Sequence, residues 1–357
     1  MSQNRSALPK RATIRDVAAL ASVSISTVSH VFSGSRPISD ATAKRVKLAA
    51  EKLQYQANPS AKSLRSARAG IIGLIMRPKD AIIGTIRGTE VFQRLLGSIA
   101  PHALKHGYGL IHVPDVLDST SNSVPMDVCI VAHPYHNDAA VAKLRSFQIP
   151  VVMIDGDPAH SDITWTVNID HTVAPRAILN AFRAEGRQRI TLISGSENNT
   201  WNSDSTAEYF AWCDEQGIKA NHHEVYEGEG IDGAMRIAYN LLSRSERPTA
   251  ILTGPSSFAN GILKVAQDLD ICVPDELALA CLSDSELTRS SHPPITSLDL
   301  CMEEVGAEAV RLAIALSKGD VPPSTPTLIT PNINWRKSLP QPIKLKRDIP
   351  QAYSITK

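Results

Sequence analysis

One segment, Asn221 to Val225, gathers three adjacent residues that could do chemistry: His222, His223 and Glu224. Three such side chains could in principle hold a metal ion. Adjacent residues of a strand point to opposite faces, however, so the two histidines cannot easily share one ion. A surface strand is therefore the better interpretation, and we predict no metal site.

Other signs of catalysis are equally scarce. The sequence contains no G-x-x-x-x-G-K-[ST], H-E-x-x-H, G-x-S-x-G or G-x-G-x-x-G motif. The acidic pairs Asp214–Glu215 and Glu303–Glu304 lie in helical patterns and are interpreted as solvated faces. We therefore predict that the protein is not an enzyme, has no catalytic residues and needs no cofactor.

Composition places the chain among globular proteins. Of its 357 residues, 43% are hydrophobic and 20% charged, enough for two or three domains. No apolar run reaches the roughly 18 residues of a membrane span, and the amino terminus has no apolar signal core. The five cysteines lack C-x-x-C spacing, which indicates reduced thiols. The expected location is the cytoplasm, with no membrane partner.

The charge is distributed unevenly. Residues 1–70 contain 12 Lys/Arg and 3 Asp/Glu, a net charge of +9, whereas residues 71–357 contain 25 and 33, a net charge of −8. A basic head on an acidic body is typical of a domain that binds a polyanion. A solvated basic tail is the alternative, but it would not carry the helical patterns described next.

The head has the pattern of three short helices. Thr13 is an N-cap for a helix with Ile14, Val17, Ala18 and Ala21 on one side. Ser24 begins a second helix, in which Val28, Val31 and Phe32 form the inner stripe and Ile25, Ser26, Ser29 and His30 the outer face. A third helix begins at Ser39–Asp40, with Val46, Ala49, Ala50 and Leu53 directed inward.

Three short helices with a tight second turn predict a helix-turn-helix. Short polar side chains on a helix can reach base edges in the major groove, and hydroxyl groups can hold phosphates. A small helical packing module with solvated serines is the alternative. Farther on, Asn58 before Pro59 begins a short helix, which we expect to be ordered only on DNA. Leu64 is a candidate minor-groove wedge, or an anchor onto the next domain.

The body alternates short apolar runs with helical stretches. This alternation predicts two parallel sheets flanked by helices, with ligands bound beyond the carboxyl ends of the strands. The predicted strands are 71–76, 108–113, 128–132, 151–155, 189–194, 249–254 and 277–283. The predicted helices are 90–106, 171–185, 203–217, 232–244 and 256–269.

The segments "TIRDVAALASVSISTVSHVF" and "SDATAKRVKLAAEKLQYQANPSAKSLRS" resemble the head of the lactose/galactose-repressor (LacI/GalR) family of bacterial transcription regulators. The resemblance implies that Ile25, Ser26 and His30 read bases and that Leu64 intercalates at the operator centre. His30 stands where many members have arginine, so the DNA site read differs accordingly. The full set of predicted DNA-binding residues is Thr13, Ser24, Ile25, Ser26, Thr27, Ser29, His30, Ala61, Lys62 and Leu64.

The body resembles the two-lobed, periplasmic-binding-protein-like core of the same family, through "IPVVMID", "HPPITSLD" and "EEVGAEAVRLAIAL". The fold class is thus α/β with a small all-α helix-turn-helix head. The expected organisation is a disordered terminus at 1–11, the helix-turn-helix at 12–56, a hinge helix or linker at 57–70, the core at 71–335 and a tail at 338–357. Lobe 1 is expected at about 71–168 and 299–328, and lobe 2 at about 169–297 and 329–337.

Three polar positions that are typical of sugar-binding members are changed. The usual effector-gripping arginine is Thr206, an Asn-Asp pair falls on Pro255–Ser256, and the "G-F-D-D" strand end reads "CLSD", which keeps only Asp284. Carboxylates and aromatic rings at strand ends still suit a polyol or sugar derivative, although each of them could instead cap a helix or pack the hinge. The candidate effector-binding residues are Glu90, Phe92, His133, Asp155, Asp170, Trp201, Thr206, Ser256, Phe258 and Asp284.

The sequence thus predicts a homodimeric repressor that binds a near-palindromic double-stranded operator and responds to a small-molecule effector between the lobes. Two alternatives stay open: a small-molecule binding protein without a specific operator, and an effector-independent repressor. Tetramerisation is disfavoured, because residues 338–357 contain three prolines and no leucine heptads. No sequence motif identifies the effector, the operator sequence or the target genes, or tells whether the effector weakens or strengthens DNA binding.

Overall fold

The computed structural model describes residues 12–33, 36–55, 68–77, 90–113, 116–117 and 125–341. The expected disordered terminus, most of the hinge segment with Ala61, Lys62 and Leu64, and the end of the tail lie outside these residues. The chain divides into two compact units, Met1–Gly70 and Ile71–Lys357. Each unit is described by itself below.

The amino-terminal unit is the predicted helix-turn-helix, with α1 (Ile14–Ala21), α2 (Ile25–Ser33) and α3 (Asp40–Lys52). Its core contains Val17, Val28 and Val46, which are all fully buried. Phe32 corrects one prediction, because its side chain is 39% exposed. Its ring packs against Tyr55 with 5.8 Å between the centroids, so Phe32 covers the edge of the core.

No single helix among the described residues is long and apolar enough to cross a membrane. The bent pair α1–α2 meets the length and composition limits together, with 105° between the two helices. That angle lies within the range of about 90–120° that is typical of a helix-turn-helix. Because Val17, Ala18, Ala21 and Val28 of these helices are buried in one cluster with residues of α3, the pair forms part of the core of a small domain.

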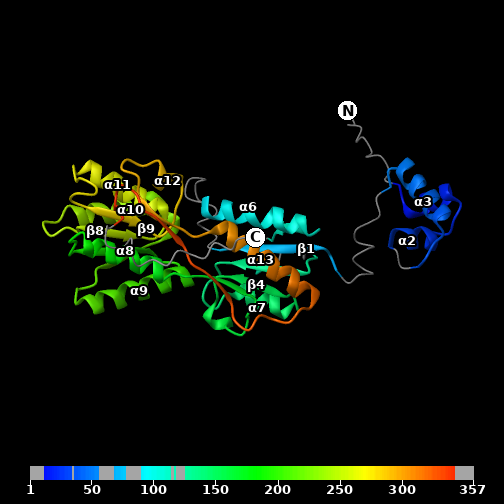
Figure 1. Cartoon of the computed structure of the whole chain (residues 1–357), viewed down its shortest axis with the longest axis horizontal. Helices are drawn as coiled ribbons and strands as arrows, with labels where there is room; N and C mark the ends of the chain where they lie inside the picture. The colour runs from blue at the N-terminus through cyan, green and yellow to red at the C-terminus, as the bar shows by residue number, and fades with distance from the viewer. Residues whose placement is uncertain are drawn as a thin grey trace, which may run out of the picture. The chain divides into compact units, whose positions relative to one another are not determined.

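The second unit contains two six-stranded sheets among the described residues (Figure 1). The first sheet has the order β11-β5-β4-β3-β1-β2, and all its pairings are parallel. Its strands are β1 (Ile71–Met76), β2 (Gly109–His112), β3 (Val128–Ala132), β4 (Val151–Ile154), β5 (Thr166–Ile169) and β11 (Thr327–Ile329). We call this sheet and its helices the first lobe.

The second sheet has the order β12-β10-β9-β8-β6-β7, and β12 is antiparallel to β10. Its strands are β6 (Ile190–Gly195), β7 (His222–Val225), β8 (Ala250–Thr253), β9 (Ala278–Cys281), β10 (Thr296–Asp299) and β12 (Asn332–Asn334). We call this sheet and its helices the second lobe. The prediction of a surface strand at Asn221–Val225 is confirmed, since β7 is an edge strand.

Helices cover both faces of each sheet, as expected for parallel strands that are buried on both sides. The first lobe carries α6 (Glu90–Lys105), α7 (Ala139–Ser146), the 3₁₀ turn η1 (Pro158–His160) and α13 (Met302–Lys318). The second lobe carries α8 (Val173–Ala184), α9 (Thr200–Gln216), η2 (Glu227–Glu229), α10 (Gly230–Leu242), α11 (Ser256–Asp268) and α12 (Glu286–Arg289). The predicted α/β class is therefore confirmed.

Successive side chains of β1 point to opposite faces of the first sheet, so its apolar residues pack against helices on both sides. Ile72 and Leu74 pack with α6 and α13, whereas Ile75 packs with α7 on the opposite face. In Figure 1, α6 and α7 accordingly lie on opposite sides of the first sheet.

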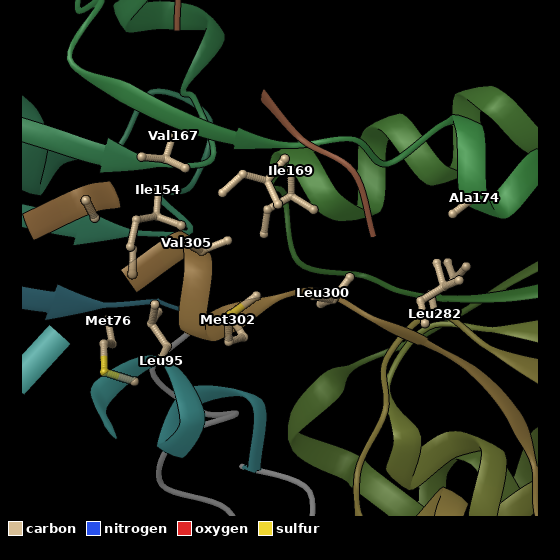
Figure 2. Close-up of a cluster of buried hydrophobic side chains, with 14 of the residues drawn as sticks. Met76, Leu95, Ile154, Val167, Ile169, Ala174, Leu282, Leu300, Met302 and Val305 are labelled. Atoms are coloured by element: carbon tan, nitrogen blue, oxygen red, sulfur yellow. The ribbon is translucent and has the colours of Figure 1, made fainter. Parts of the chain in front are cut away.

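The chain passes between the lobes after β5, after β10 and between β11 and β12. A single hydrophobic cluster continues through this hinge region into both lobes. Figure 2 shows Leu300 between Met302 of the first lobe and Leu282 of the second. All seven predicted strands occur, but β5, β10, β11 and β12 were not predicted; each has only three or four residues.

Candidate functional site

The start of α2 is fixed by hydroxyl groups. Ser24 caps the helix, because the Thr27 backbone N–H donates to Ser24 Oγ at 3.1 Å. The same oxygen lies 2.7 Å from Ser26 Oγ and 2.8 Å from Thr27 Oγ1. In the preceding turn Ser22 has a positive φ of 51°, and the Val23 N–H donates to the Ala18 carbonyl. This tight turn sets the angle at which α2 leaves α1.

The outer face of α2 carries the predicted base-reading residues. Ile25 is 46% exposed and Ser26 is exposed, while Ser29 and His30 are half-buried. The exposed Ile25 side chain is suited to an apolar contact in the major groove, where the methyl group of thymine is such a partner. Val28, on the opposite face, holds the helix against the core.

Thr13 has a structural role at the start of α1. Its backbone N–H and its hydroxyl both donate to Asp16 Oδ2 at 2.7 Å. The exposed N-terminus of α1 also suits a phosphate group, because helix N-termini attract anions. The DNA-binding roles of the head residues remain predictions.

At the carboxyl ends of the first-lobe strands, Asp155 joins two histidines. Asp155 follows β4 and is only 2% exposed. His133, which follows β3, donates from Nδ1 to Asp155 Oδ2 at 2.8 Å, and His171 Nε2 lies 3.1 Å from the same oxygen. The Ile169 backbone N–H donates to Oδ1 at 3.0 Å. A single carboxylate thus ties β3, β4 and the chain after β5 together.

Electrostatics stabilise this arrangement. Burial alone would raise the pKa of Asp155, but His171 and His133 outweigh it and hold that pKa well below its usual range. Burial likewise lowers the pKa of His171, but the Asp155 carboxylate outweighs it and raises that pKa above the ordinary histidine value. His171 was missed from sequence, because only the sheet order shows that it faces Asp155.

Phe92 lies beside this group. Its ring is 5.9 Å from the His133 ring, nearly perpendicular to it. His133 Nε2 is buried and has no hydrogen-bond partner among the described residues. When His133 is neutral and donates through Nδ1, its Nε2 is an acceptor. A ligand hydroxyl is therefore a suitable donor for this atom.

Several predicted ligand residues have structural roles instead. Asp170 lies just before α8, where its Oδ1 accepts from the N–H groups of Thr172 and Val173 at 2.9 and 3.1 Å. Phe258 is fully buried in the core of the second lobe, so its ring does not face a ligand. Ser256 is buried too, and its backbone N–H donates to Ser283 Oγ at 3.0 Å.

Asp284 is also occupied by the chain itself. Arg336 Nη1 and Nη2 donate to Asp284 Oδ1 and Oδ2 at 2.9 and 3.0 Å. Ser297 donates to Oδ1 at 2.8 Å, and Thr288 does so as well. Burial alone would raise the pKa of Asp284, but these partners lower it. Asp284 therefore links the end of β9 to β10, and its carboxylate oxygens are already hydrogen-bonded within the chain.

Trp201 and Thr206 are half-buried on α9, and Trp201 packs against the shared hydrophobic cluster. Glu90 is the first residue of α6, and its carboxylate contacts α12 in the second lobe, as described below. Of the ten candidates, Phe92, His133 and Asp155 are brought together by the structure. Their roles in ligand binding remain predictions.

Sequence reasoning also missed Glu227. Its carboxylate accepts from the backbone N–H groups of Ser196 and Glu197 and from Asn202 Nδ2, between 2.6 and 3.3 Å. It lies directly over Gly195, where an added Cβ would fall 1.8 Å from Glu227 Oε1. The Glu227 carboxylate therefore occupies a group of N–H donors at the carboxyl end of β6.

The described residues contain no group of three or more His, Cys, Asp or Glu that could hold a metal ion. His222 Nε2 lies 2.8 Å from Ser194 Oγ, whereas His223 Nε2 lies 3.1 Å from Asn221 Oδ1. The two rings thus have different neighbours, as the strand geometry predicted.

Two family models match the sequence. Residues 13–58 match the bacterial regulatory proteins of the lacI family, and residues 179–339 match a periplasmic binding protein-like domain. The chain is 26% identical over 336 residues to catabolite control protein A of Priestia megaterium, covering 91% of this chain and 98% of that protein. It is 25% identical over 315 residues to the HTH-type transcriptional repressor PurR of Pasteurella multocida, covering 84% and 90%.

Among solved structures, the lac repressor dimer bound to operator and the anti-inducer ONPF superposes with a TM-score of 0.78. The identity is 19%, and the match covers 93% of this chain and 100% of that chain. At this identity the match shows a shared fold. The first family model falls on the helical head, and the second falls on part of the α/β core.

Proposed function

We propose that this chain, which matches the lacI family model over residues 13–58, is a transcriptional repressor whose affinity for operator DNA is set by a small molecule. The observation that carries the proposal is α2. Its inner face is buried against α1 and α3, while Ile25 and Ser26 face outward in a unit with a net charge of +9. An exposed helix of this kind fits the major groove.

The proposed form on DNA is a homodimer. Two α2 helices would enter successive major grooves of a near-palindromic operator, and the residue 57–70 segments would pair between them. The lac repressor structure, a dimer on its operator, supports this arrangement. The curated relatives are transcriptional regulators and not enzymes, which is consistent with a chain without catalytic motifs. We place the protein in the bacterial cytoplasm, where its DNA partner is found.

The proposed effector site is the carboxyl edge of the first-lobe strands. Phe92 offers a ring and His133 offers Nε2 as an acceptor, while Asp155 holds the His133 ring in place through Nδ1. Such a set suits a neutral hydroxylated molecule, in which a ring covers the apolar face and oxygen or nitrogen atoms accept from hydroxyl groups. A ligand that prefers one angle between the lobes would shift operator affinity by its differential affinity for the two states.

The test is selection of binding sites from randomised double-stranded DNA by the purified full-length protein, followed by fluorescence anisotropy at several salt concentrations. We expect one enriched near-palindromic sequence, with an affinity about 10³-fold or more above unrelated DNA, and a steep decrease with salt. His30→Ala should relax the selected sequence at defined positions. Lys143→Ala, an exposed change on α7 of the core, is the control. Equal binding to all sequences would contradict the proposal and favour a small-molecule binding protein.

The effector is tested by a thermal-shift screen against sugars, sugar phosphates, polyols and nucleobases, with each hit then added to the operator complex. We expect a hit that raises Tm and also changes operator affinity. Stabilisation follows RT ln(1 + [L]/Kd), or about 2.7 kcal/mol at 100 times Kd. Operator binding that responds to none of these compounds would favour the effector-independent repressor.

A further inference from the structure

Residues of the chain itself join the two lobes directly. We propose that Glu90 and Arg289 form a latch between the lobes, and that this latch sets the lobe arrangement that controls operator affinity. The inference rests on the proposed function, because it assumes that lobe movement regulates DNA binding. It adds the specific contact through which that movement is restrained.

The contact uses both oxygens of one carboxylate. Glu90 begins α6 of the first lobe, and Arg289 ends α12 of the second. Arg289 Nη2 donates to Glu90 Oε1 at 2.7 Å, and the Glu286 backbone N–H donates to Glu90 Oε2 at 2.6 Å. The Arg289 side chain is 39% exposed and the Glu90 side chain is 24% exposed, so the pair is partly shielded from water. A two-point contact fixes orientation as well as distance.

The second-lobe side of the latch has a rigid base. Arg289 Nη1 also lies 3.4 Å from Asp284 Oδ2. Asp284 is held in turn by Ser297 on β10 and by Arg336, which follows β12. Strands β10 and β12 border two of the three chain crossings between the lobes. The position of Arg289 is therefore restrained by contacts near the hinge, and not only by its own side-chain conformation.

A second set of contacts between the lobes contains no ion pair. The His136 backbone N–H donates to the Asn198 carbonyl at 2.8 Å, and Tyr135 forms an isolated bridge with Asn199. The loop that carries Tyr135 is held in the first lobe by the buried ion pair of Arg77 with Asp138. These backbone contacts report on lobe separation, because they break only if the lobes themselves move apart.

The same helix α6 offers a matched control within one lobe. Arg94 lies one turn after Glu90, and its guanidinium donates to both oxygens of Glu303 on α13, at 2.8 and 2.6 Å. Arg94 and Glu303 both belong to the first lobe, whereas Asp299, whose Oδ1 lies 3.0 Å from Arg94 Nη2, ends β10 of the second lobe. The control therefore changes Glu303 and leaves the Arg94–Asp299 pair in place. Removing the Arg94–Glu303 pair should change helix packing slightly, since surface ion pairs contribute little, but should not alter the angle between the lobes.

The experiment compares Glu90→Gln, Arg289→Gln, the double variant and Glu303→Gln in the full-length protein. Amide hydrogen exchange is measured for the segments that contain Glu286 and His136, and operator affinity is measured by anisotropy. We expect Glu90→Gln and Arg289→Gln each to increase exchange at both segments by about fivefold to tenfold. The double variant should add little more, because both changes break one contact. Glu303→Gln should leave both segments unchanged.

Operator affinity should change by a similar factor in Glu90→Gln and Arg289→Gln, but not in Glu303→Gln. Faster exchange at Glu286 alone, with His136 unchanged, would overturn the latch, because the contact would then be purely local. Faster exchange at both segments with unchanged operator affinity would overturn its regulatory role. If the wild-type protein bound no specific operator, the proposed function would fail, whereas the exchange data would still decide whether the latch joins the lobes.

Discussion

Asp155→Asn tests whether one buried carboxylate organises the proposed effector site. The change keeps the size of the side chain and an acceptor for the Ile169 N–H, but it removes the charge that pairs with His133 and His171. Breaking a buried charge pair by removing one partner costs about 3–5 kcal/mol. Because asparagine keeps part of the hydrogen bonding, we expect the lower end, about 3 kcal/mol.

The pH dependence follows from the two shifted pKa values. The pKa of Asp155 is lowered, so its contribution is present at every pH above its unfolded value of about 3.9 and is lost only in acid. The pKa of His171 is raised, so its contribution is complete below an unfolded value of about 6.5 and disappears as the pH rises through the folded pKa. The stability difference between wild type and Asp155→Asn should therefore be larger near about pH 6 than near about pH 9.

Thermal unfolding of the full-length protein, followed by circular dichroism at both pH values, measures this difference. A loss of about 3 kcal/mol corresponds to a Tm decrease of roughly 6–12 °C for a domain of this size. Asp162→Asn is the matched control, because Asp162 pairs with Arg145 on the surface and both side chains are about half exposed; since exposed ion pairs contribute little, it should leave Tm nearly unchanged. A difference that stays constant or grows with rising pH would refute the proposed His171–Asp155 pairing.

Three further changes test other parts of the structure. Ile25→Ala should weaken binding to the selected operator, measured by anisotropy, while Tm stays within about 2 °C, since the side chain is largely outside the core; unchanged affinity would remove Ile25 from the DNA contact. Gly195→Ala should destabilise the protein by about 2–4 kcal/mol in urea unfolding, because the new Cβ would displace the Glu227 carboxylate from its N–H donors. Gly97→Ala, in the middle of α6 with open space around it, should instead stabilise by about 0.5–1 kcal/mol; a similar loss in both variants would exclude the steric explanation. Leu64→Ala should reduce DNA bending in a gel-mobility assay, and an unchanged bend would refute the wedge prediction.

Local patterns were sufficient to predict most secondary structure. The Ser24 cap, the buried Val28 and the helical spacing of α1 to α3 depend on neighbours within about four residues, which are visible in sequence. Strand β1 was readable for the same reason, as an apolar run of six residues. In contrast, β10 and β12 are short and rich in polar residues, so only pairing with neighbouring strands defines them.

The site is where sequence and structure diverge. Asp284 was a reasonable ligand candidate until the fold brought Arg336, 52 residues later, against its carboxylate. His171, 16 residues after Asp155, and Arg289, 199 residues after Glu90, had no pattern that marked them as partners.

The sequence by itself determined the helical pattern of the head and the face of α2 that is directed outward, because helix periodicity and capping act between near neighbours. Only the tertiary structure decided which polar groups at the strand ends are already satisfied by the chain and which remain for a ligand. That decision depends on strand order and on the crossings between the lobes, which join residues with no local relationship.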